Sequence, residues 1–82
     1  MNLIFYHRPD CHLCKEMDRA LRPLAVELNL VITQIDVESD PELEERYGIQ
    51  VPVLIHDGSE LCHYHLDEAA IRQFVATKRG TC

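Results

Sequence analysis

The sequence predicts an α/β domain with the element order βαβαββα, in which three helices flank a four-stranded mixed sheet. Short apolar runs of strand length alternate along the chain with apolar residues at helical spacing, which is the pattern of an α/β layer fold. The 82 residues suffice for one compact domain with a modest core. No repeat, low-complexity segment or linker divides the chain. We therefore expect a single domain over residues 1–82, with residues 80–82 as a frayed tail.

The first half of the chain predicts a strand, a long helix and a second strand. The run Asn2–Tyr6 is apolar and short, as expected for a buried strand. A helix should begin at Cys11 with Asp10 as its N-cap, and Pro23 should kink this helix or weaken it locally. Its apolar stripe consists of Leu13, Met17, Leu21, Leu24 and Leu28. Residues 31–37 form the second strand. Because a helix joins the two strands, they should be parallel.

The second half predicts a short helix, a hairpin and a final helix. Asp40 followed by Pro41 is a typical helix start, and Gly48 should end this helix. Residues 51–56 and 60–64 are the strands of the hairpin. Asp67 should cap the last helix, in which Ile71, Phe74 and Val75 face inward. The turn Asp57-Gly58 between the two strands is a strong hairpin signal. This hairpin would add the antiparallel half of the sheet.

Charge and hydropathy exclude several classes of partner. Acidic residues outnumber basic ones by 14 to 8, and the formal net charge is −6. A nucleic-acid-binding domain normally presents a basic face, so we expect no nucleic-acid partner. No apolar run approaches the roughly 20 residues of a membrane-spanning helix, so we expect no membrane association. The N-terminus enters a predicted strand without the features of a signal peptide, and we expect a cytoplasmic protein.

The sequence Cys11-His12-Leu13-Cys14 at the start of the first helix is the strongest chemical signal. The unpaired N–H groups and the dipole at a helix N-terminus favour negative charge, and thus the thiolate of Cys11. Cys14, one turn further on, should be more buried and able to resolve a mixed disulfide on Cys11. Cys62 is expected to be a small strand residue. Cys82, in the predicted tail, has no assigned role.

Two other roles for the cysteine pair remain open. The cysteines could pack in the core without chemistry, or they could bind a metal. A structural zinc site commonly has four ligands in two pairs, and Cys62, His63 and His65 could supply the second pair. Their spacing differs from that of a zinc finger, and they alternate with apolar residues as strand residues do.

Two residues near the cysteines could influence their chemistry. His12, if protonated, would stabilise the thiolate and make the disulfide more oxidising, whereas a neutral His12 would have little effect. Arg8, three residues before Cys11, could also stabilise the thiolate or hold a carboxylate of the substrate. A plain surface arginine is the alternative.

The pair Val51 and Pro52 is the second signal. A proline that opens a strand after a helix and a short loop is a site for a cis peptide bond. Such a bond would turn the backbone of Val51 outward with its N–H and C=O unpaired. An extended peptide or glutathione could then add to it as a strand. An ordinary trans proline at a strand edge is the alternative.

Together these residues resemble the glutaredoxin family within the thioredoxin-like superfamily. The matching segments are Leu3–Tyr6, Arg8-Pro9-Asp10-Cys11-His12-Leu13-Cys14, Val51-Pro52-Val53-Leu54, the turn Asp57-Gly58 and the last helix. The chain is most similar to short, mostly uncharacterised bacterial glutaredoxin-like proteins. This resemblance implies a thioredoxin-like fold, Cys11 as nucleophile, Cys14 as resolving thiol, and Pro52 as a cis-proline that faces them.

The sequence departs from the glutaredoxin pattern at three places. His12-Leu13 replaces the usual Pro-Tyr, and Gln50 replaces the usual Thr before Val-Pro. The stretch 63–67 lacks the glycine pair that holds the γ-glutamyl end of glutathione in the family, and only Asp67 could substitute. These departures argue against glutathione as a co-substrate, although it remains a candidate.

The sequence therefore predicts a small thiol–disulfide oxidoreductase or electron carrier that uses Cys11 and Cys14. Its substrate would be a disulfide-containing protein or a small thiol, and a reductase or glutathione would donate the electrons. We expect a monomer without a resident cofactor or metal, and Arg8, Val51 and Pro52 as substrate contacts. The alternative is a non-enzymatic module that binds zinc or an iron–sulfur cluster through the two cysteines.

Overall fold

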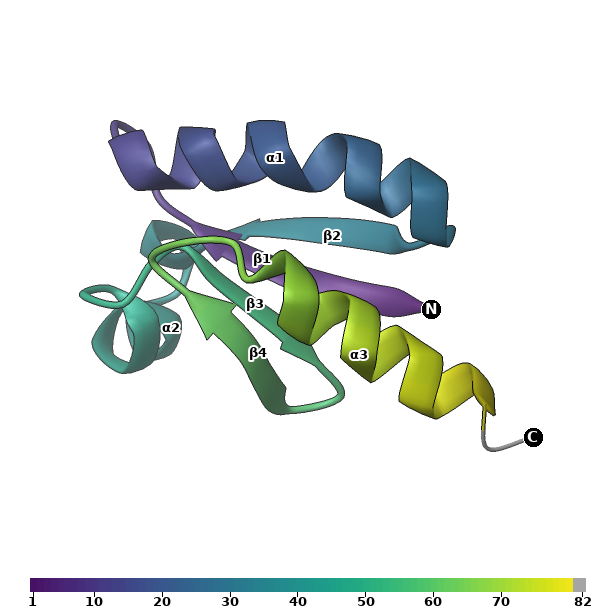
Figure 1. Cartoon of the computed structure of the whole chain (residues 1–82). Coiled ribbons are helices and arrows are strands. Elements are labelled where there is room, and N and C mark those ends of the chain that lie inside the picture. Colours follow the sequence, from purple (N-terminus) through teal and green to yellow (C-terminus); the bar gives the residue numbers. More distant parts are fainter. Residues whose placement is uncertain (81–82) are drawn as a thin grey trace.

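The computed structural model describes residues 1–80, with side chains for residues 1–78. Its four-stranded sheet has the order β2-β1-β3-β4 (Figure 1). The elements are β1 Asn2–His7, α1 His12–Leu28, β2 Val31–Asp36, the short 3₁₀ helix η1 Val37–Ser39, α2 Pro41–Tyr47, β3 Val53–His56, β4 Ser59–His63 and α3 Glu68–Gly80. β1 is parallel to β2 and antiparallel to β3, which is antiparallel to β4. The predicted mixed sheet with three helices is confirmed.

The buried apolar residues form two clusters, a larger one and a second one of Cys14, Val37 and Val51. Leu3 and Phe5 of β1 pack with residues of both α1 and α3, whereas the ring of Tyr6 stacks on that of Tyr47 in α2, with centroids 4.6 Å apart. The larger cluster contains Leu3, Phe5, Met17, Leu21, Leu24, Leu30, Leu54, Cys62, Ile71 and Val75. Because side chains alternate along a strand, α1 and α3 cover one face and α2 covers the other (Figure 1).

Several predicted caps and turns are confirmed. Asp40 accepts a hydrogen bond from the N–H of Glu42 at 2.9 Å, and Asp67 accepts one from the N–H of Ala70 at 3.0 Å. In the hairpin turn, Asp57 and Gly58 have φ values of 49° and 83°. Two consecutive residues with positive φ match the twist of the flanking strands, which explains why Asp-Gly connects them.

Other predicted boundaries were wrong. The N-cap of α1 is Cys11, and Asp10 lies in the preceding loop with a φ of 58°. The second strand ends at Asp36 because its carboxylate accepts from the N–H of Glu38 and starts η1 there. The third strand begins only after the residues 51–52. Gly80, which the sequence analysis assigned to a frayed tail, is the last residue of α3. Residues 81–82, which include Cys82, lie outside the residues that the structure describes.

Pro23 does not interrupt α1, which runs as one assigned helix from His12 to Leu28. The proline lies on the solvent-exposed side of the helix, as does Arg19 four residues earlier. Proline cannot donate to the Arg19 carbonyl, but at an exposed position water can hydrogen-bond to that carbonyl instead. Within residues 1–80, no helix combines the length and apolar character needed to cross a bilayer.

Candidate active site

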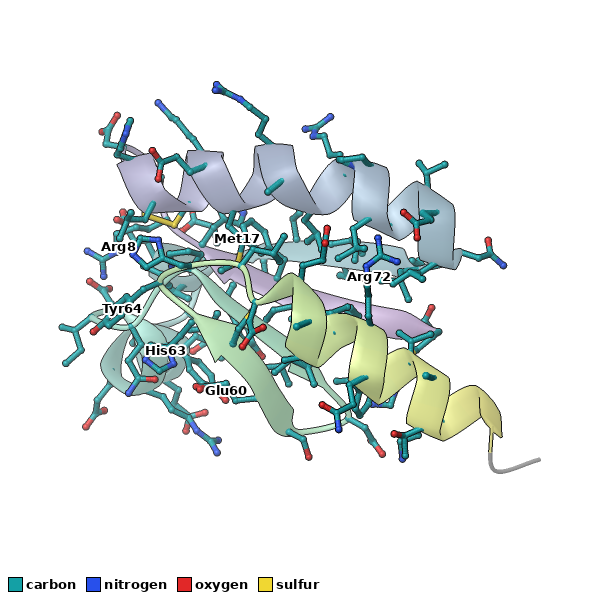
Figure 2. All side chains as sticks on the ribbon, in the orientation of Figure 1. Arg8, Met17, Glu60, His63, Tyr64 and Arg72 are labelled. Atoms are coloured by element: carbon teal, nitrogen blue, oxygen red, sulfur yellow. A yellow bond between two sulfur atoms is a disulfide. The ribbon has the colours of Figure 1, made fainter. Side chains whose placement is uncertain are left out.

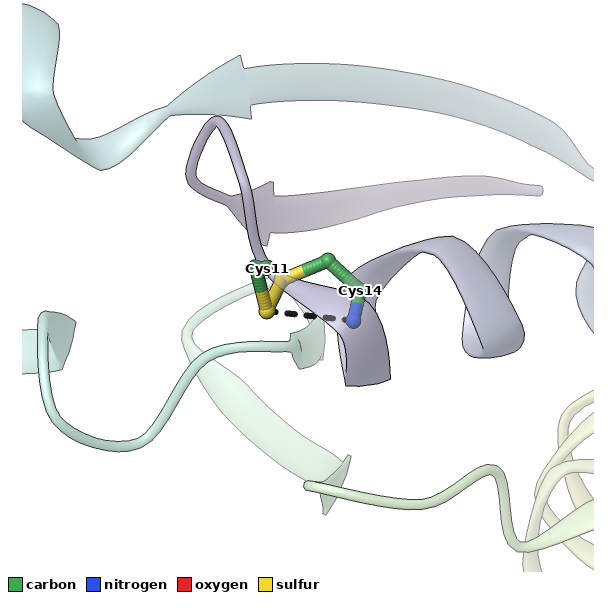
Figure 3. Close-up of a disulfide and its surroundings, with 2 residues drawn as sticks. All are labelled: Cys11 and Cys14. Atoms are coloured by element: carbon green, nitrogen blue, oxygen red, sulfur yellow. Dashed lines mark hydrogen bonds between the residues drawn. A yellow bond between two sulfur atoms is a disulfide. The ribbon is translucent and has the colours of Figure 1, made fainter.

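The two cysteines of the motif form a disulfide at the first turn of α1 (Figure 3). Their Cα atoms are 5.2 Å apart. The Sγ atom of Cys11 accepts a hydrogen bond from the backbone N–H of Cys14 at 3.1 Å, so this sulfur caps one of the free N–H groups of the helix. A negative charge that develops on the Cys11 sulfur would therefore lie at the positive end of the helix dipole.

The two sulfur-bearing side chains differ in exposure. Cys14 is 4% exposed and packs with Val37 and Val51 in the second apolar cluster. Cys11 is partly exposed and packs at the edge of this cluster. An external thiolate can thus approach Cys11 more readily than Cys14. This is the asymmetry that the spacing of the motif predicted.

The peptide bond between Val51 and Pro52 is cis, as predicted. The prediction that the Val51 N–H is unpaired was wrong, because it donates to the Tyr47 carbonyl at 3.0 Å. The Gln50 N–H donates to the same carbonyl at 2.8 Å, since the chain continues to turn after α2. Val51 is also only 7% exposed. Its N–H cannot pair with a substrate unless this contact breaks.

Arg8 lies against the C-terminal end of α2. Its Nη2 atom is 3.9 Å from Oε1 of Glu44, and its Nε atom is buried without a hydrogen-bond partner in the structure. A cation at this end of a helix is favourable. Gly48 ends the helix as predicted, but with a right-handed φ of −54°. A Cβ atom at Gly48 would lie 2.7 Å from Nη2 of Arg8, so the glycine leaves room for the arginine.

His12 points along the helix surface. Its side chain is 84% exposed, and Nε2 is 3.1 Å from Oε1 of Glu16 on the next turn. The group in contact with this ring nitrogen is thus a carboxylate of α1. The proposed effect of His12 on the cysteines would act through charge over a distance.

The other candidate metal ligands do not gather with the motif. Cys62 is 8% exposed and lies in the larger cluster, where burial raises the pKa of its thiol. His63 follows it on β4, faces the opposite side, and has its Nδ1 atom 2.9 Å from Glu60. Among the residues that the structure describes, no three or more His, Cys, Asp or Glu side chains form a group that could hold a metal ion.

Tyr64 is a residue near the site that the sequence analysis did not single out. It follows β4 with a φ of 64°, and its N–H donates to the carbonyl of Pro52 at 2.9 Å. Its hydroxyl donates to the carbonyl of Ile49 at 3.2 Å. Figure 2 shows Tyr64 at the same end of the molecule as Arg8. The only sequence signal was its place in the stretch 63–67, which lacks the glycine pair that the family resemblance leads one to expect.

Comparisons with known proteins identify the family of this chain. A family model described as Glutaredoxin-like domain (DUF836) matches residues 2–76. The uncharacterised proteins Rv0508 of Mycobacterium tuberculosis and Mb0520 of Mycobacterium bovis are each 30% identical over 74 residues, covering 84% of this chain and 76% of the relative.

Solved structures show the same fold. Protein Ne2328 from Nitrosomonas europaea is 36% identical with a TM-score of 0.78, over 89% of this chain and 88% of that one. Protein XcR50 from X. campestris is 32% identical with a TM-score of 0.68, over 92% and 96%. Thioredoxin 1 from Thermosipho africanus, at 17% identity and a TM-score of 0.67 over 96% and 99%, shares the fold. With its cysteine pair at the start of α1, this chain belongs to the glutaredoxin-like domain family and has a thioredoxin-like fold.

Proposed function

We propose that the protein is a small thiol–disulfide oxidoreductase or electron carrier that alternates between a Cys11–Cys14 disulfide and a dithiol. The observation that carries the proposal is the unequal exposure of two bonded cysteines at a helix N-terminus. Cys14 is 4% exposed, whereas Cys11 is partly exposed and accepts an N–H hydrogen bond on its sulfur. One sulfur is thereby suited to exchange with a partner, and the other to act only within the molecule.

The reaction would proceed in two exchanges. In the first, the Cys11 thiolate attacks a substrate disulfide; a bond forms between Cys11 and one substrate sulfur, and the other substrate sulfur leaves as a thiolate. In the second, the Cys14 thiolate attacks the Cys11 sulfur, re-forms the internal disulfide and releases the remaining substrate thiolate. Two electrons pass to the substrate. An external reductant, either a reductase or a thiol, then restores the dithiol.

The surroundings of the pair support this chemistry. The N–H groups of the first turn and the dipole of α1 favour the thiolate form of Cys11 in the reduced protein. Arg8, with a third of its side chain exposed, could hold a substrate carboxylate beside Glu44. His12 would add positive charge near the sulfur when it is protonated. A disulfide-bonded protein is the substrate class we propose.

Substitution of each cysteine tests the proposal. We expect Cys11→Ser to abolish reduction of a model protein disulfide such as that of insulin. Cys14→Ser should accumulate a mixed disulfide through Cys11, which mass spectrometry would detect. Cys62→Ala is the matched control, because this buried thiol lies in the other cluster and should not be needed for turnover. Full activity of Cys11→Ser, or stoichiometric zinc or iron in the purified protein, would contradict the proposal.

A further inference from the structure

Tyr64 adopts a backbone conformation that is unusual for an aromatic residue. Its φ is 64°, in the left-handed region that glycine enters most easily. Two backbone hydrogen bonds hold this turn, from the Tyr64 N–H to the Pro52 carbonyl at 2.9 Å and from the His65 N–H to the His63 carbonyl at 2.7 Å. The turn between β4 and α3 thus fixes where the tyrosine ring can lie.

The ring of Tyr64 lies over the segment 49–52, which precedes β3. At one end of this segment the Tyr64 N–H binds the Pro52 carbonyl, and at the other its hydroxyl binds the Ile49 carbonyl at 3.2 Å. The neighbouring His63 ring and the tyrosine ring make a T-shaped contact, with centroids 4.7 Å apart. Tyr64 is therefore hydrogen-bonded to both ends of the segment, and 40% of the surface of Tyr64 remains exposed.

The segment 49–52 borders the disulfide. Val51 packs with Cys14 in the second apolar cluster, and Figure 3 shows the chain entering β3 beside the cysteine pair. The N–H groups of Gln50 and Val51 are bound to the Tyr47 carbonyl, and proline has no N–H. Tyr64 binds two of the four carbonyls of the segment, that of Pro52 through its main-chain N–H and that of Ile49 through its side-chain hydroxyl.

We propose that Tyr64 determines which thiols exchange with the Cys11–Cys14 disulfide, by covering the segment 49–52 and excluding peptide-like thiols such as glutathione. This inference rests on the proposed thiol–disulfide exchange. A thiol without a peptide backbone needs only the Cys11 sulfur and is unaffected. A peptide thiol that pairs with the segment must first displace a hydrogen-bonded side chain.

The exchange in question is reduction by glutathione. Its thiolate attacks the Cys11 sulfur, which forms a mixed disulfide and releases the Cys14 thiolate. A second glutathione thiolate attacks the sulfur of the bound glutathione, which yields glutathione disulfide and the Cys11 thiolate. Two glutathione molecules are oxidised and one protein disulfide is reduced. The first of these steps requires glutathione beside the segment that Tyr64 covers.

The test is the rate at which glutathione reduces the disulfide in the wild type and in Tyr64→Gly, compared with the rate for dithiothreitol. Glycine adopts the left-handed conformation without strain, so the turn is retained while the ring is removed. We expect the rate constant for reduction by glutathione to rise about tenfold in Tyr64→Gly, because glutathione no longer has to displace a hydrogen-bonded side chain. The dithiothreitol rate constant should stay within about twofold.

Two further variants control for loss of structure. Tyr64→Asn also tolerates a positive φ and lacks the ring, so it should show the same selective gain. Tyr64→Phe keeps the ring without the hydroxyl and should gain less than the glycine variant. No gain with glutathione, or an equal gain with both reductants, would overturn the role of Tyr64. Failure of dithiothreitol to reduce the wild-type disulfide would instead refute the proposed exchange chemistry.

Discussion

The proposed exchange requires the protein to stay folded when the Cys11–Cys14 disulfide is reduced, and this is the most decisive prediction for the pair. The bond closes a loop with a sequence separation of 3. The chain-entropy model assigns a loop this short about 2 kcal/mol of stabilisation at 25 °C. A natural domain of 82 residues has a stability of roughly 4–12 kcal/mol at the usual value per residue. The reduced protein should therefore remain folded.

Thermal unfolding measured by circular dichroism, with and without a phosphine reductant, checks this prediction. For a domain of this size each 1 kcal/mol corresponds to a change in Tm of about 4–8 °C, so reduction should lower Tm by about 8–16 °C. A Cys11→Ser, Cys14→Ser double variant should behave like the reduced protein. If reduction unfolds the protein at room temperature, the disulfide is structural, and the reasoning from loop length and exposure fails.

Two stability predictions follow from other contacts. Gly48→Ala should lower the free energy of unfolding, measured with urea, by about 1–3 kcal/mol, because the added methyl group would overlap Nη2 of Arg8 and the Glu44 carbonyl. This loss exceeds the stabilisation of about 0.4–1 kcal/mol that a strain-free Gly→Ala change provides. A variant as stable as the wild type would refute the close approach. Hydrogen bonding from Arg72 lowers the pKa of Glu27, so this contact stabilises the fold at neutral pH and its contribution is lost as the pH falls through the lowered pKa. Glu27→Gln should accordingly be less stable than the wild type at pH 7 and equally stable in strong acid, whereas a difference that persists in acid would contradict this linkage.

The sequence by itself determined the element order and the place of the Cys11–Cys14 motif. Helical and strand periodicities and the caps at Asp40 and Asp67 depend on residues within one or two turns of each other. The Asp57-Gly58 turn and the start of α1 near Cys11 are equally local. Asp10 was the local feature that misled, because the Cys11 sulfur accepts the capping hydrogen bond in its place.

Only the tertiary structure decided what surrounds the motif. The sequence indicated that Cys14 would be the more buried cysteine, but not that Val51 packs against it or that the Val51 N–H is bound to Tyr47. The position of Tyr64 over the segment 49–52 depends on β4 lying beside β3, which brings residues 15 apart in sequence into contact. Such contacts depend on strand order and packing, which local periodicity does not encode. Local patterns thus placed Cys11 and Cys14 at the start of α1, whereas packing between distant segments determined which residues surround them.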